Sequence, residues 1–183
     1  MPADRGSGPT AAAAPPVTVE VGGRGMVIRP LRDMVEAAAC ATIMASTEPW
    51  ITLGRDFESA MSVIAVPDRE TYVAVDDDGV AGFVVIQMRG AFIGYIQSIA
   101  VRADQRSRGL GRQLIRFAED RILAETPNVF LCVSSFNPRA RRLYEQLGFE
   151  LVGELRDYVV AGHSELLMRK STGPLRPGAR RQA

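Results

Sequence analysis

Arginine and glycine residues between positions 101 and 112 have the types and spacing of an anion-binding loop. The apolar run 95–101 is typical of a strand, and a helix-like pattern begins near Gly109. Gly109 and Gly111 lack a Cβ atom, so a bulky anion can approach the backbone closely. The first N–H groups of a helix have no intrahelical partner and lie at the positive end of its dipole. The segment therefore predicts a phosphate site, and the five arginines between 102 and 116 agree with it.

The loop differs from two well-known phosphate fingerprints. A Walker loop needs Gly-Lys-Ser/Thr after its second glycine, whereas an arginine and a glutamine follow here. The dinucleotide fingerprint needs a third glycine or alanine where Leu114 stands. What remains is Arg106-x-x-Gly109-x-Gly111 after a strand, which resembles the pyrophosphate loop of the GCN5-related N-acetyltransferase (GNAT) superfamily. Taken alone, the segment could also be a solvated, arginine-rich helix start.

Residues 137–149 carry a second pattern that resembles the same superfamily. They read Asn-Pro-Arg-Ala-Arg-Arg-Leu-Tyr-Glu-Gln-Leu-Gly-Phe and fit the signature Asn-x-x-Ala-x-x-Leu-Tyr-x-x-x-Gly-Phe. Asn137 is a good helix N-cap, Pro138 suits the first helical position, and Gly148 suits the C-terminal end. The order and separation of the two segments also match, and the resemblance covers about residues 26–170.

The order of elements predicts an α+β fold. Antiparallel strands come first and a strand–helix–strand–helix–strand series follows, which indicates one mixed, mostly antiparallel sheet with helices on both faces. The expected strands are 26–32, 71–75, 80–87, 92–101, 129–134, 149–160 and 164–169, and the expected helices are 33–45, 56–63, 109–124 and 138–147. In the acyl-CoA N-acyltransferase (GNAT) fold that the resemblance implies, acetyl-CoA sits where two parallel strands splay apart. Here these would be 92–101 and 129–134.

The two ends of the chain differ in composition from its middle. Residues 1–25 are rich in Ala, Gly and Pro, while 171–183 carry three arginines and little that could pack. We expect both to be disordered tails around a GNAT domain over 26–170. The alternating segment 17–21 could nevertheless add an edge strand.

Charge and composition exclude several classes of function. The formal net charge is +1 and the arginine cluster of 102–116 is local, which argues against a general nucleic-acid binder with a broad basic face. The sequence has no apolar run of membrane-spanning length. It has one histidine and two distant cysteines, so we expect no metal site. Cys40 and Cys132 are interpreted as small buried residues in a reducing cytoplasm.

The resemblance implies acetyl-CoA as co-substrate and assigns roles to both motifs. The pyrophosphate would accept N–H bonds from residues 106–111, with three arginines of the loop as charge partners. The pantetheine arm would pair with the backbone of 99–101, and Asn137 would hold it from the other side or serve only as a helix cap. The residues expected to bind acetyl-CoA are Ile99, Ala100, Val101, Arg106, Ser107, Arg108, Gly109, Leu110, Gly111, Arg112 and Asn137.

Tyr144 is the candidate general acid, because the matching tyrosine of the superfamily points its hydroxyl at the CoA sulfur. The alternative is a core aromatic on an apolar helix face. No general base is identified. The segment 128–149 and the Arg156-Asp157-Tyr158 ending also resemble the bacterial acetyltransferase of ribosomal-protein N-termini. The glutamate that precedes its motif asparagine by five residues is Cys132 here, so that mechanism does not carry over. Water relayed to Gln97, Ser98 or Glu48 could replace it, whereas His163 is expected at an exposed hairpin tip.

The acceptor pocket is expected between the first two helices and the last hairpin. Its candidates are Glu48, Trp50, Asp56 and Phe57, acids to attract a cationic amine and aromatics to pack on it. The sequence therefore predicts an N-acetyltransferase acting on an amine of a small molecule or peptide. The alternatives are an N-terminal acetyltransferase of the ribosomal-protein type and a non-catalytic acyl-CoA-binding module. The resemblance also allows a homodimer.

Overall fold

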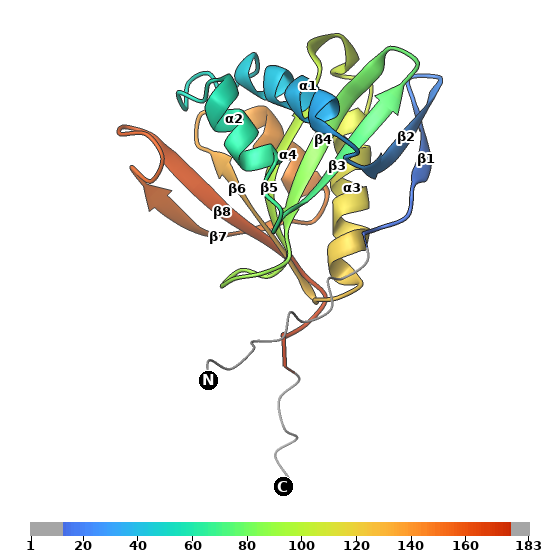
Figure 1. Ribbon diagram of the computed structural model, residues 1–183. Helices are drawn as coiled ribbons and strands as arrows, with labels where there is room; N and C mark the ends of the chain where they lie inside the picture. The colour runs from blue at the N-terminus through green and yellow to red at the C-terminus, as the bar shows by residue number, and fades with distance from the viewer. Residues whose placement is uncertain (1–12, 177–183) are drawn as a thin grey trace, which may run out of the picture.

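A mixed sheet of eight strands and four α-helices make up the computed structural model, which describes residues 13–176 (Figure 1). The strands are β1 (Val17–Val21), β2 (Arg24–Pro30), β3 (Glu70–Asp76), β4 (Gly79–Gln87), β5 (Tyr95–Val101), β6 (Asn128–Ser134), β7 (Glu150–Arg156) and β8 (Ser164–Ser171). The helices are α1 (Met34–Ala45), α2 (Phe57–Ile64), α3 (Leu110–Leu123) and α4 (Pro138–Gln146), with a 3₁₀ turn at Ala103–Gln105. The strand order is β1-β2-β3-β4-β5-β6-β8-β7, and only the β5–β6 pair is parallel.

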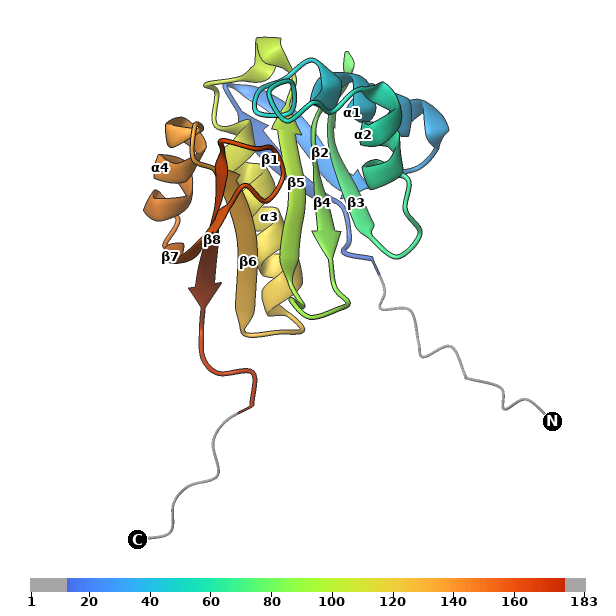
Figure 2. The ribbon, with the colours of Figure 1, turned by 90° about the vertical axis from the view of Figure 1, so that its left-hand side faces the viewer.

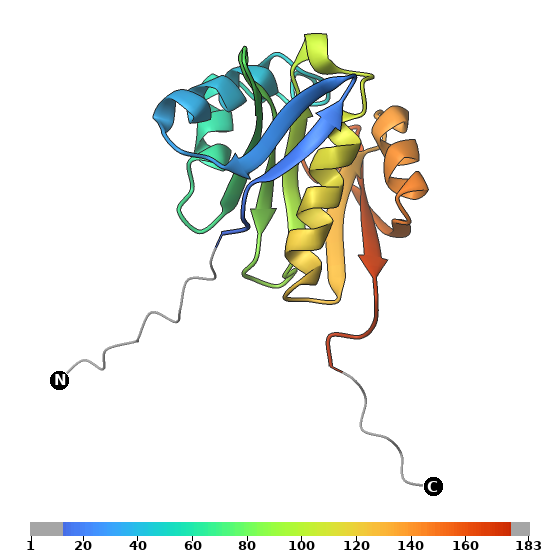
Figure 3. The ribbon, with the colours of Figure 1, turned by 90° about the vertical axis from the view of Figure 1, so that its right-hand side faces the viewer.

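The helices cover both faces of the sheet, as the sequence predicts. Helices α1 and α2 pack on one face, where Cys40, Met44 and Phe83 belong to one buried apolar cluster. Helix α3 crosses the other face beside α4 (Figure 3), and Leu114 and Tyr144 belong to a second cluster there. The α+β fold is therefore confirmed, with an apolar core on each side of the sheet.

Capping residues set the helix starts close to the expected positions. Asp33 accepts hydrogen bonds from two backbone N–H groups of α1, and Asp56 accepts one from Ser59 of α2. Asn137 accepts a bond from the Ala140 N–H at the start of α4. Each cap satisfies N–H groups that the helix itself leaves unpaired.

Two strands are shorter than expected, and one expected tail contributes a strand. The expected strand 92–101 begins only at Tyr95, because Gly94 closes a turn in the left-handed region with a φ of +84°. The expected strand 149–160 ends at Arg156, where Asp157 also turns at positive φ. Segment 17–21 forms β1 and pairs antiparallel with β2, so the expected tail 1–25 is too long at its inner end. The remainders of the two tails, residues 1–12 and 177–183, lie outside the described residues.

A wedge opens between β5 and β6 in the middle of the sheet. The two parallel strands are in register only at Tyr95 with Phe130 and Ile96 with Leu131. The pairing of β5 with β4 is irregular just after this point, next to Gln97, and an extra residue of this kind bends a strand away from its neighbour. Beyond the bend the two strands diverge (Figure 2), so the edge of β5 that faces β6 has backbone groups free to pair with a ligand.

Candidate active site

One large cleft occupies the wedge and has a volume of about 1040 Å³. Its walls come from β5, β6, the start of α3, α4, the α1–α2 connection and the β7–β8 turn. Segments far apart in the sequence therefore meet at the place where the two parallel strands separate. Twelve of the expected site residues line it, namely Glu48, Trp50, Ile99, Ala100, Val101, Arg106, Ser107, Gly109, Gly111, Arg112, Asn137 and Tyr144.

The loop before α3 presents an uncapped helix start to the cleft. Gly109 is the N-cap residue in the left-handed conformation, with a φ of +99°, and no side chain caps the first turn. Ser107 also has positive φ, at +65°. Successive N–H groups in such a turn, followed by a 14-residue helix, form a concavity that suits an anion.

Arginines from three elements surround this concavity. Arg106 donates from Nη2 to Thr47 Oγ1 at 2.7 Å and from Nε to the Val101 carbonyl at 3.2 Å. Arg112 donates to Gln146 on α4 at 2.8 Å, and Arg139 donates to the Ser107 hydroxyl at 2.9 Å. Arg142 also lines the cleft. The positive charge is therefore concentrated at the end of the cleft where the glycine loop lies.

Two of the expected cofactor residues point elsewhere. The Arg108 side chain lies against the β1–β2 turn, where a Cβ atom built on Gly22 would be 3.3 Å from Arg108 Cδ. The Leu110 side chain is 1% exposed and belongs to the core beneath α3. The expected role of the Arg108 side chain as a charge partner is therefore wrong, since this side chain does not line the cleft. Leu110 can contribute only its backbone N–H to the loop.

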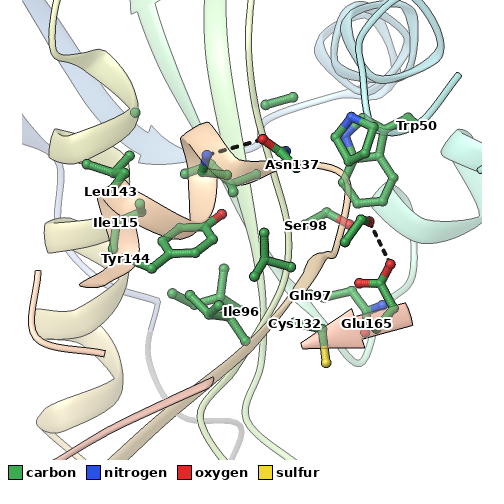
Figure 4. Close-up of a pocket in the computed structure, with 18 of the residues that line it drawn as sticks. Trp50, Ile96, Gln97, Ser98, Ile115, Cys132, Asn137, Leu143, Tyr144 and Glu165 are labelled. Carbon is green, nitrogen blue, oxygen red and sulfur yellow. Dashed lines mark hydrogen bonds between the residues drawn. The ribbon is translucent and has the colours of Figure 1, made fainter. Parts of the chain in front are cut away.

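Tyr144 stands in the wedge with its hydroxyl directed into the cleft, near Ile96, Ile115 and Leu143 (Figure 4). Its side chain is 7% exposed, and burial raises the pKa of the phenol to about 12. The group is therefore protonated at neutral pH and can donate a proton or a hydrogen bond. Its ring centroid lies 6.0 Å from that of Phe149, so Tyr144 is part of the core and of the cleft wall together.

Glu165 is a carboxylate that the sequence interpretation missed. It lies on β8 directly opposite Ser134 of β6, and the Ser134 hydroxyl donates to Glu165 Oε1 at 2.6 Å. The side chain lines the cleft although the residue is only 7% exposed. Burial raises the pKa of Glu165, and the bond from Ser134 opposes this in part. A carboxylate whose pKa is raised in a cleft is suited to accept a proton.

Tyr95 and Cys132 lie beside this carboxylate. The Tyr95 hydroxyl and the Cys132 thiol influence each other's ionisation, and burial raises the pKa of both groups. Cys132 is only half-buried and lines the cleft, so its interpretation as a small buried residue is wrong. Cys40, in contrast, is completely buried in α1. Both groups beside Glu165 are thus neutral at physiological pH.

The α1–α2 connection carries the expected acceptor residues Glu48 and Trp50, whereas the expected Asp56 caps α2 and neither it nor Phe57 lines the cleft. Glu48 accepts a hydrogen bond from the Thr52 N–H at 3.2 Å and remains exposed at the rim. Trp50 lies across the cleft from Glu165 (Figure 4), and the Arg55 guanidinium is 5.8 Å from its ring centroid. Gln97 and Ser98 also line this part of the cleft. His163 does not: it is half-buried against the ring of Phe136, with 4.7 Å between centroids.

One signal in the sequence could have pointed to Glu165. It directly precedes the apolar run Leu-Leu-Met of its strand, where a buried carboxylate needs a hydrogen-bonding partner or a function. Its partner Ser134 is 31 residues away and belongs to no recognised motif. Within residues 13–176 there is no cluster of three or more His, Cys, Asp or Glu side chains that could hold a metal ion. No helix in that range is both long and apolar enough to cross a membrane.

Comparison with known families and structures gives consistent matches. Residues 32–149 match the model of the acetyltransferase (GNAT) family. A GNAT-family protein from Desulfovibrio desulfuricans has 21% identity and a TM-score of 0.68, over 81% of this chain and 99% of its own. An aminoglycoside 6′-N-acetyltransferase complexed with coenzyme A has 19% identity and a TM-score of 0.65, over 82% and 99%.

A third similar structure is the ribosomal-protein-S18-alanine N-acetyltransferase from Escherichia coli. It has 21% identity and a TM-score of 0.64, over 86% of this chain and 99% of its own. No curated protein matches the sequence. At these identities the structural likeness supports the fold, while the family match covers both motifs that line the cleft.

Proposed function

Because the chain belongs to the acetyltransferase (GNAT) family, we propose that it transfers the acetyl group of acetyl-CoA directly to a primary amine, with Glu165 as general base and Tyr144 as general acid. The observation that carries this proposal is the cleft itself. It joins an uncapped, arginine-lined helix start to a buried carboxylate and a buried phenol.

The cofactor end of the cleft fits an elongated anion. The glycine loop offers backbone N–H groups and Arg106 and Arg112 offer charge, as the pyrophosphate of acetyl-CoA requires. The free edge of β5 along 99–101 offers backbone groups to the amides of the pantetheine arm. Asn137 uses its side-chain oxygen for the helix cap, so its amide nitrogen can still donate to the arm.

Glu165 and Tyr144, both buried, carry out the two proton transfers that the reaction needs. The ammonium group of the acceptor must lose a proton before its nitrogen can attack, and Glu165 accepts it. The nitrogen then attacks the thioester carbonyl, the C–N bond forms and the C–S bond breaks. Tyr144 gives its proton to the departing thiolate and regains one as the amide nitrogen loses its second proton. No covalent enzyme intermediate is needed, and holding the reactants together supplies much of the rate.

The acceptor half of the cleft suits an amine with one positive charge and an apolar flank. Its charged side chains are Glu48, Glu165 and Arg55, which is too little negative charge for a polycation. Its uncharged wall includes the exposed aromatic residues Tyr158 and Phe92 beside the polar Gln97 and Ser98. We therefore propose a hydrophobic monoamine or a peptide with an apolar first residue as acceptor, in preference to a polyamine or aminoglycoside.

Thiol release from acetyl-CoA tests the proposal directly. We expect turnover with phenylalkyl amines or peptides that begin with an apolar residue, at a kcat/KM at least about tenfold above that for spermidine or an aminoglycoside. Acetyl-CoA should also raise the melting temperature, because it binds only the folded state. Binding without turnover for any amine would favour the non-catalytic acyl-CoA-binding module, and absence of binding would exclude both.

A further inference from the structure

A single side chain connects the two ends of the cleft. Arg106 belongs to the glycine loop, yet its Nη2 donates to the hydroxyl of Thr47, 59 residues earlier in the chain, at 2.7 Å. Thr47 is 8% exposed and begins the connection between α1 and α2. The Nε of the same guanidinium donates to the Val101 carbonyl at the end of β5. The anion site and the acceptor wall therefore share one hydrogen-bonded residue.

Hydrogen bonds connect the residues of the segment that begins at Thr47 to one another. The Ile51 N–H donates to the Thr47 carbonyl at 3.2 Å, and the Arg55 N–H donates to the Trp50 carbonyl at 2.9 Å. Glu48 accepts from Thr52 within the same turns. Fixing Thr47 therefore fixes the backbone that carries Glu48 and Trp50 in the acceptor half of the cleft.

The guanidinium can hold this bond and an anion at the same time. An arginine has five N–H donors in a rigid plane. The bonds to Val101 and Thr47 use the single N–H of Nε and one N–H of Nη2. Three N–H groups are left for an anion in the loop, and Arg106 is exposed on the side that lines the cleft. An anion there immobilises the same plane that holds Thr47.

We propose that Thr47 is a positioning residue, which orders the acceptor segment through Arg106 when a pyrophosphate occupies the glycine loop. The inference rests on the proposed function only for the identity of the anion. Because coupling between two sites is reciprocal, an ordered acceptor segment must also strengthen coenzyme binding. Loss of the Thr47 hydroxyl is expected to weaken coenzyme binding about three- to tenfold, in the range of the net contribution of one typical intramolecular hydrogen bond.

Trp50 is the only tryptophan in the chain and stands three residues after Thr47, so its fluorescence reports on this segment alone. The probe is 3′-phosphoadenosine 5′-diphosphate, which carries the pyrophosphate of CoA without the pantetheine arm and so does not reach Trp50 through the wedge. In the wild type, saturating probe should lower acrylamide quenching of Trp50 about twofold and raise its anisotropy. Calorimetry on the same samples measures binding independently.

Three variants separate coupling from folding. Thr47→Val keeps the side-chain shape and removes the hydroxyl, so the probe should bind more weakly and leave Trp50 quenching unchanged at saturation. Thr47→Ser keeps the hydroxyl and should restore the Trp50 response. The matched control is Arg112→Gln, which lowers probe affinity but should retain the full response at saturation, because Arg112 contacts α4 and not the acceptor segment.

Each outcome decides the proposal. A full Trp50 response in Thr47→Val, or no response in the wild type despite measured binding, overturns the coupling and leaves the proposed function standing. A Thr47→Ser variant that behaves like Thr47→Val shows a packing effect and also overturns it. If neither the probe nor CoA gives any heat with the wild type, the proposed function fails together with the coupling. Thermal unfolding of all variants confirms that they are folded.

Discussion

The proposed cofactor end and acceptor end of the cleft differ in the groups that line them and in how far apart in the sequence these groups lie. At the proposed cofactor end, the groups available to a ligand are backbone N–H groups and arginines from one loop and from the starts of helices α3 and α4. At the acceptor end they are side chains from the α1–α2 connection, β6 and β8, brought together only by the sheet. The first end is local in sequence and uses geometry that any acyl-CoA needs. The second is assembled over long distances and can vary with the acceptor.

A substitution at Gly111 is expected to disable the proposed cofactor end most strongly. A Cβ atom built there meets only Val101 Cγ2 at 3.9 Å, so a larger side chain extends into the cleft without a clash inside the fold. We expect Gly111→Val to lower acetyl-CoA affinity more than about a hundredfold, because it occupies the approach to the N–H groups. Calorimetry measures the change, with Gly111→Ala as the milder matched control. Wild-type affinity in the Val variant would place the phosphate elsewhere.

Gly109 gives a less clean test than Gly111. Its φ of +99° strains any other residue, so Gly109→Val also costs stability, on the order of 1–3 kcal/mol. The loss of coenzyme binding there would be mixed with a loss of folding.

At the acceptor end the largest effect is expected for Glu165→Gln. Removing the general base should lower kcat about a hundred- to a thousandfold. Because burial raises the pKa of Glu165, its charge weakens the folded state at neutral pH, so the Gln variant should be as stable as the wild type or more stable. Turnover assays and thermal unfolding together check this. Loss of stability parallel to loss of activity would indicate a structural role instead.

Tyr144→Phe tests the residue that both ends share. The ring still packs against Phe149, so only the hydroxyl is removed. We expect kcat to fall about ten- to a thousandfold with little change in acetyl-CoA affinity, since the thiolate charge develops only in the transition state. Unchanged kcat would return Tyr144 to a purely structural role and leave protonation of the thiolate to water.

Two arginines of the same loop are expected to differ in their effect on acetyl-CoA binding. Arg112 lines the cleft and Arg108 lies against the β1–β2 turn. Arg112→Gln should weaken acetyl-CoA binding about three- to tenfold, whereas Arg108→Gln should change it less than about twofold. Equal effects in a binding titration would mean that only the summed charge of the loop matters.

The smallest expected effect is a stability difference at alkaline pH. The unfolded chain loses the Tyr144 proton near pH 10, while in the folded protein the pKa is about 12. Between these values the folded state binds more protons, so stability falls as pH rises. The wild type should therefore lose up to about 2 kcal/mol more than Tyr144→Phe across this range. Denaturant unfolding at several pH values measures the difference, and identical slopes would contradict the buried phenol.

The sequence predicts the features that depend on neighbouring residues and misses those that depend on distant segments. The helix starts at Asp33, Asp56 and Asn137 and the glycine loop depend on a few neighbouring residues, so local chemistry predicts them. The pairing of Glu165 with Ser134 depends on the register of two strands that are 31 residues apart, which no local pattern determines. The direction of Arg108 depends on its contact with the β1–β2 turn, more than 80 residues earlier in the chain, which no local pattern determines.

The central claim is that Glu165 removes a proton from the acceptor in the same cleft that holds acetyl-CoA. The most direct test is kcat/KM of the wild type and of Glu165→Gln with one amine across a range of pH. The ratio of the two cancels the ionisation of the amine, so it isolates Glu165. We predict that the ratio rises with pH through a pKa above the ordinary value of a glutamate and then reaches a plateau. A ratio that is flat across the pH range would contradict the account.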